Sequence, residues 1–85
     1  MAAQQSMWHV NDVVAYDVMR ELSGGLQARL LDLARDGDRS AHAELLEVRR
    51  TTTAVDGYDR AAVDSCTRQL RLRDAELALA ASGAS

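Results

Sequence analysis

The chain has 85 residues, which fits one domain, and its lack of Pro and Phe together with abundant Ala and Leu favours helices over sheets. The formal net charge is -3 and the arginines are dispersed, so no nucleic-acid partner is expected. Because the chain has no run of about 18 apolar residues, no signal-peptide pattern and no disulfide partner for Cys66, we expect a single cytoplasmic domain over residues 1–85 that does not engage a membrane.

The first expected element is a long amphipathic helix over residues 10–33. Asn11 or Asp12 is suited to its N-cap. The Gly24–Gly25 pair costs about 1 kcal/mol per glycine relative to Ala, yet the apolar positions keep their phase across it, which favours one helix with a weak or kinked point. An apolar residue recurs at every fourth position and predicts an inward stripe: Val10, Val14, Val18, Leu22, Leu26 and Leu30.

A loop over residues 35–39 should separate this helix from a second one that starts near Ser40. Gly37 is suited to the end of the first helix, and the neighbouring acids and Ser40 are suited to the next N-terminus. The second helix carries a narrow apolar stripe that should face inward: Ala41, Leu45, Val48, Thr52 and Val55.

A turn at Asp56–Gly57 precedes the third helix. Asp59 is suited to its N-cap, and Tyr58 and Val63 have the spacing of a hydrophobic staple. Three amphipathic helices with short connections predict an all-α fold, an antiparallel three-helix bundle. Because each stripe is narrow, we expect the isolated bundle to be marginally stable and to gain stability from a partner or from a second copy of the chain. The inward face of the third helix should hold Val63, Cys66, Leu70 and Leu77.

No residue pattern indicates catalysis, a cofactor or a metal. Cys66 falls on the core face of its helix, as free cysteines commonly do. His9 and His42 lie on different helices and lack the spacing of metal ligands. The Ser23-Gly24-Gly25 segment lacks the Lys-Ser/Thr of a phosphate-binding loop. An enzyme is therefore the least favoured class.

The two ends of the chain, residues 1–9 and 80–85, are expected to be flexible. Trp8 fits either a cover over the open end of the bundle or an anchor in a protein interface. The adjacent Arg49 and Arg50 fit either a solvated face or a contact to an acidic partner.

Four segments between Val13 and Leu72 carry a family resemblance: Asp17-Val18-Met19-Arg20-Glu21-Leu22-Ser23, Leu26-Gln27-Ala28-Arg29-Leu30-Leu31, Glu44-Leu45-Leu46-Glu47-Val48 and Tyr58-Asp59. In order and spacing they resemble the epsilon antitoxins of epsilon–zeta toxin–antitoxin systems, which are three-helix proteins of similar length. The chain departs from that family at its glycine pair.

The resemblance implies that the chain binds a zeta toxin, a P-loop kinase understood to phosphorylate UDP-N-acetylglucosamine, and that the first helix occludes the nucleotide site. Asp17 falls at an acidic position of the family's first helix, and Glu21 matches as well. Asp12, Tyr16 and Arg20 are added from the helical wheel, which places them with Asp17 opposite the apolar stripe. We expect these five residues to form the toxin-binding surface, and homodimerisation within a heterotetramer is compatible with it.

Two other classes stay open. One is a helical interaction module that inhibits or stabilises a different toxin or partner. The other is a DNA-binding autoregulator, which the acidic balance and the lack of a basic recognition helix disfavour. A neighbouring reading frame that encodes a P-loop kinase would favour the antitoxin.

Overall fold

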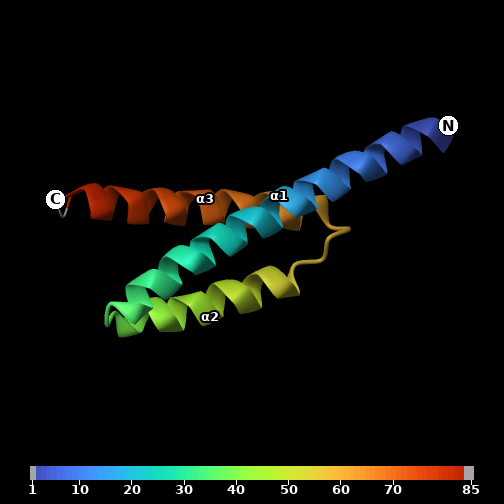
Figure 1. Cartoon of the computed structure of the whole chain (residues 1–85). Helices are drawn as coiled ribbons and strands as arrows, with labels where there is room; N and C mark the ends of the chain where they lie inside the picture. The colour runs from blue at the N-terminus through green and yellow to red at the C-terminus, as the bar shows by residue number, and fades with distance from the viewer. Residues whose placement is uncertain (1, 84–85) are drawn as a thin grey trace.

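The fold is an all-α, antiparallel three-helix bundle, as predicted (Figure 1). The computed structural model describes the backbone of residues 2–83 and the side chains of residues 10–83, so the side chains of Trp8 and His9 lie outside the described residues. The long first helix packs against both other helices and is therefore the central element. No helix in the described range is long and apolar enough to cross a membrane. The helices are α1 (Ala2–Arg35), α2 (Arg39–Ala54) and α3 (Arg60–Gly83).

Helix α1 begins well before the predicted start. It runs from Ala2, so the prediction that Asn11 or Asp12 caps it is wrong. Residues 2–9 include Ala, Gln and Met, which are good helix formers, and contain no Gly or Pro that would stop a helix. The helix also continues without a break through Gly24–Gly25.

The apolar stripe of α1 is only partly the predicted one. Leu26 and Leu30 are buried, together with Met19, whereas Val10 and Val14 are 60% and 55% exposed. A step of four residues overshoots one helical turn by about 40°, so a ladder of six such positions rotates by about 200° from its first member to its last. Val10 therefore faces away from the side on which Leu30 is buried.

A buried chain of hydrogen bonds fixes α1 against α2. The Thr52 hydroxyl donates to the carbonyl oxygen of Val48 (2.8 Å), so the Ser23 hydroxyl must donate to Thr52 (2.8 Å), because each hydroxyl has one hydrogen. The Gln27 amide in turn donates to Ser23 Oγ (2.9 Å). Since Ser23 is buried, this directed chain fixes the register of the two helices.

The inward stripes of the other two helices are confirmed. Ala41 is buried, and Leu45, Val48, Thr52 and Val55 of the same stripe are half-buried. Around α1 these side chains and those of α3 close one hydrophobic core. Its buried members are Met19, Leu26, Leu30, Ala41, Val63, Cys66 and Leu70.

The connection between α1 and α2 ends one helix and starts the next within three residues. Gly37 has a φ of 102°, a left-handed conformation that favours glycine. Its N–H donates to the carbonyl of Ala34 and that of Asp38 donates to Leu33, the pairing of a Schellman motif. Asp38 then caps α2, because its carboxylate accepts from the N–H of Ala41 at 3.1 Å.

The Asp38 cap gives a prediction about pH. Hydrogen bonds from the Ser40 hydroxyl and the Ala41 N–H lower the pKa of the Asp38 carboxyl. A lowered pKa adds stability above the unfolded value, and this is lost as the pH falls through the folded value. We expect Asp38→Ala to lower the melting temperature at neutral pH and to differ less from wild type in acid. The matched control is Asp36→Ala in the same loop, and equal effects of both changes would contradict the cap.

One of the two predictions for the start of α3 is confirmed and the other is wrong. Asp59 caps the helix by accepting from the N–H of Ala62 at 3.1 Å. The hydrophobic staple is wrong, because Val63 is fully buried while Tyr58 is 84% exposed. The Tyr58 N–H is held by the side chain of Asp56 at 2.9 Å, a local turn that directs the ring outward.

Candidate functional site

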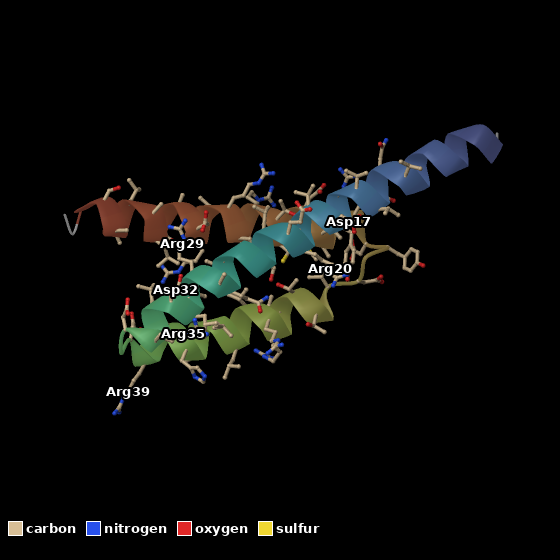
Figure 2. All side chains as sticks on the ribbon, viewed as in Figure 1. Asp17, Arg20, Arg29, Asp32, Arg35 and Arg39 are labelled. Carbon is tan, nitrogen blue, oxygen red and sulfur yellow. The ribbon has the colours of Figure 1, made fainter. Side chains whose placement is uncertain are left out.

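The exposed side of α1 carries apolar residues followed by acids. We call the set Val10, Val13, Val14, Asp17 and Glu21 the outer stripe; all five are exposed. At about 100° per residue, their Cβ atoms fall within an arc of about 100°. Asp17 lies where α1 leaves the bundle (Figure 2). The stripe therefore forms one continuous surface on a helix whose opposite side is anchored in the core.

The predicted toxin-binding residues do not all lie on this surface. Asp17, Arg20 and Glu21 are exposed, as expected. Asp12 faces α3, where its carboxylate pairs with Arg60 at 3.1 Å and its side chain is only 12% exposed. Tyr16 is half-buried. Placing Asp12 and Tyr16 on the outer surface was wrong, because they lie about 140° and 100° around the helix from Asp17.

Tyr16 instead holds the loop between α2 and α3 close to α1. A Cβ atom at Gly57 would lie 3.2 Å from the Tyr16 ring, so a larger residue there would force the ring to shift by a few tenths of an ångström. The Asp12–Arg60 ion pair fixes the start of α3 beside the same segment. Asp12 and Tyr16 are thus positioning residues for the loop.

The loop extends the apolar surface of the outer stripe. Val13 and Tyr58 line a common hollow together with Tyr16 and Val55. Exposed apolar residues that gather in one place mark interaction sites more often than single ones do. Tyr is also frequent among the residues that dominate binding energy at interfaces. The structure therefore shows an exposed apolar patch that sequence reasoning missed. The signal that could have found it is that a spacing of four residues overshoots one helical turn, so that Val10 and Val14 do not share a face with Leu30.

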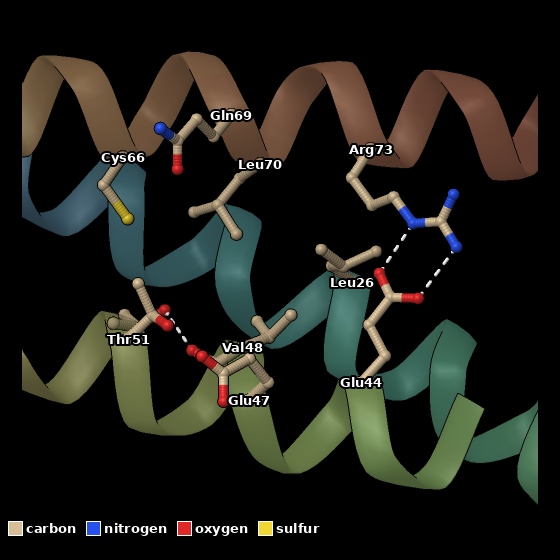
Figure 3. Close-up of a pocket in the computed structure, with 10 residues that line it drawn as sticks. Leu26, Glu44, Glu47, Val48, Thr51, Cys66, Gln69, Leu70 and Arg73 are labelled. Atoms are coloured by element: carbon tan, nitrogen blue, oxygen red, sulfur yellow. Dashed lines mark hydrogen bonds and ion pairs between the residues drawn. The ribbon is translucent and has the colours of Figure 1, made fainter. Parts of the chain in front are cut away.

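A second groove separates α2 from α3 and has a different character (Figure 3). Leu26, Val48 and Leu70 line it. Arg73 crosses it and donates two hydrogen bonds to Glu44, at 2.6 and 2.8 Å. This bidentate pair links α3 to α2. Because Arg73 and Glu44 bond to each other, neither charge is left unpaired at that end of the groove.

The thiol of Cys66 lies at the same groove and is not suited to nucleophilic chemistry. Cys66 is buried, as predicted. Burial raises the pKa of its thiol, against a smaller lowering by a hydrogen bond with Thr52. Little thiolate therefore forms at neutral pH. Over the described range, no group of three or more His, Cys, Asp or Glu side chains could hold a metal ion.

No family model, curated protein or solved structure matches the chain. The outer stripe with Tyr58 is thus the structural observation that bears on function, and the family resemblance of the sequence stays a prediction.

Proposed function

We propose that the chain is a helical antitoxin that binds a zeta-type P-loop kinase and blocks its nucleotide site with the outer stripe of α1. The observation that supports this most is the projection of α1 beyond both other helices, with its exposed valines and acids (Figure 1). A helix that docks in a groove uses anchors at positions i, i+3, i+4 and i+7. Val10, Val13, Val14 and Asp17 have that spacing.

The charges of the outer stripe suit a phosphate-binding site. A P-loop directs backbone N–H groups and a lysine toward the phosphates of its nucleotide. Asp17 and Glu21 are one turn apart and exposed, and within the described range neither carboxylate forms an ion pair. They would compete with phosphate oxygens, while the helix body, about 10 Å across, excludes the nucleotide sterically.

The apolar part of the surface would supply most of the contact area. Val10, Val13 and Val14 are more than half exposed, and Tyr58 extends them onto the loop. β-branched residues are poor helix formers, so neither helix propensity nor the core accounts for valines at these positions. A hydrophobic partner surface accounts for them. A heterotetramer built from two such complexes stays a prediction.

The test reverses both charges of the stripe with Asp17→Arg and Glu21→Arg together. We expect the double variant to bind the P-loop kinase encoded by a neighbouring reading frame about a hundredfold more weakly, because like charges then meet at a desolvated interface. The kinase should regain ATP binding and phosphorylation of UDP-N-acetylglucosamine. Calorimetry and a kinase assay with the full-length chain measure these effects.

The matched control is Asp32→Arg with Asp36→Arg, a double reversal at the same sequence spacing, with Asp32 in the last turn of α1 and Asp36 in the loop directly after it, where both acids are exposed. This control should leave neutralisation unchanged. If the Asp17/Glu21 variant keeps the circular dichroism of wild type and still neutralises the kinase fully, the proposal is wrong. If no such kinase binds the wild-type chain, a helical module for a different toxin or partner replaces the antitoxin of a zeta-type kinase.

A further inference from the structure

Two arginines from different helices share one hollow on the α1–α2 side of the bundle. The hollow is lined by Arg20, Gly24 and Gln27 of α1 and by Arg49 and Thr53 of α2, among others. In Figure 2, Arg20 lies on the α2 side of α1, whereas Arg29 reaches toward α3. The hollow contains no residue of the outer stripe, although Arg20 lies only about 20° around α1 from Val13, and it shares Thr52 with the α2–α3 groove.

The two arginines of this hollow are among the six of the chain's ten that form no ion pair over the described residues, and they come from different helices. Arg29, Arg50, Arg60 and Arg73 each pair with an Asp or Glu of the chain. Over the described residues, the guanidinium groups of Arg20 and Arg49 have no ion pair or hydrogen bond, although the chain has 13 acids against 10 bases. Two like charges therefore share a hollow in a protein with acids in excess, and a bound anion would relieve their repulsion.

The floor of the hollow is open to close approach. A Cβ atom at Gly24 would meet nothing within 4 Å, so the fold does not need a glycine there. With no side chain at this position, the α1 backbone is exposed at the hollow that both arginines line. A planar guanidinium matches a carboxylate with two parallel N–H donors, and Gln27 adds a further polar group.

Apolar side chains continue the same face away from the arginines. Leu31 lies 11 residues after Arg20, which returns it to nearly the same side of α1 about 16 Å further along. Leu46 lies one turn before Arg49 on α2. Both leucines are exposed. The two guanidinium groups therefore have an exposed leucine one turn from Arg49 and another about three turns from Arg20, an arrangement that an acidic amphipathic helix can cover with its carboxylates and its apolar face.

We infer that Arg20 and Arg49 form a carboxylate-binding subsite that receives a Glu or Asp side chain from an acidic amphipathic helix of a protein partner. The same helix covers Leu31 and Leu46. The inference goes beyond the proposed function, because it concerns a hollow that contains no residue of the outer stripe and holds whether or not the partner is a kinase. Of the two interpretations that the sequence left open for Arg49, a solvated face or a contact to an acidic partner, the inference favours the second.

The test uses the full-length, isotope-labelled chain without any kinase, so its outcome is independent of the antitoxin proposal. The probe is a synthetic, end-blocked helical peptide of Glu, Leu and Ala, with Leu on one face. We expect it to shift the NMR signals of the Arg20 and Arg49 Nε–H groups and of the Gly24 amide. Arg20→Gln with Arg49→Gln should weaken binding about tenfold or more. Both side chains are exposed, so this variant should keep the circular dichroism of wild type.

The matched control is Arg68→Gln with Arg71→Gln, which neutralises two exposed arginines on α3 that, within the described range, form no ion pair. It should bind the peptide as wild type does. A peptide with Gln in place of Glu should bind about tenfold more weakly. Equal losses in the two arginine pairs, or absence of binding up to about millimolar peptide, would overturn the inference. Saturable shifts of the same signals by inorganic phosphate alone, without peptide binding, would overturn the carboxylate assignment.

Discussion

Leu30→Ala is expected to lower the free energy of unfolding by about 3 kcal/mol, which leaves much of the isolated chain unfolded. Leu30 is fully buried and belongs to the core cluster that the three helices share. The loss combines the hydrophobic burial of the removed atoms with the cavity that the small bundle cannot fill. Urea denaturation followed by far-UV circular dichroism measures it.

Leu79→Ala makes the same chemical change on the surface and serves as the control. Leu79 of α3 is 72% exposed, so its truncation should change the free energy of unfolding by less than about 0.5 kcal/mol. Equal losses for the two variants would contradict the packing of α1 described above. A sharp, high-temperature melt of the wild-type chain alone would contradict the expectation of marginal stability.

The double variant Gly24→Ala, Gly25→Ala should raise the free energy of unfolding by about 2 kcal/mol. Each glycine in a helix costs about 1 kcal/mol relative to Ala, because it loses more backbone freedom on folding. Neither added methyl group would meet an atom within 4 Å, and neither glycine has a positive φ. Thermal and urea denaturation of both single variants and of the double variant give the increments.

Two other glycines provide the contrast. Gly57→Ala would bring a methyl group to 3.2 Å from the Tyr16 ring, and Gly37→Ala would strain a residue with a φ of 102°. Both changes should fail to stabilise the chain.

If alanine at Gly24 and Gly25 stabilises the protein and also weakens binding of the acidic peptide, the glycines serve to keep the α1 backbone accessible to the ligand. Unchanged peptide binding would contradict that role.

Local chemistry accounts for what the sequence predicts well. Asp59 caps α3 because a side-chain oxygen in that position satisfies a free N–H of the first turn, whatever the rest of the fold does. Gly37 ends α1 because few other residues adopt its backbone conformation. The inward stripes of α2 and α3 are short, so the drift of an apolar repeat has little room to accumulate.

The same local reasoning misplaces the candidate site. Val10 and Val14 continue the apolar repeat that buries Leu30, and Asp12 with Tyr16 continue a polar one. A repeat of four residues does not stay on one face over a helix of 34 residues. In the folded chain the loop after Ala54 covers Tyr16, and Arg60 at the start of α3 pairs with Asp12. In this part of α1 the polar residues are therefore the less exposed ones, and the valines face outward.

The sequence alone determined the helical class, the order of the three helices, the glycine that ends α1 and the aspartate that caps α3, because these depend on interactions within a few residues. It also determined that the chain carries an excess of acids and a single thiol. Only the tertiary structure decided which face of α1 is exposed and that Arg20 and Arg49 share a hollow. Burial depends on where the neighbouring helices begin and end, and a helical repeat does not contain that information.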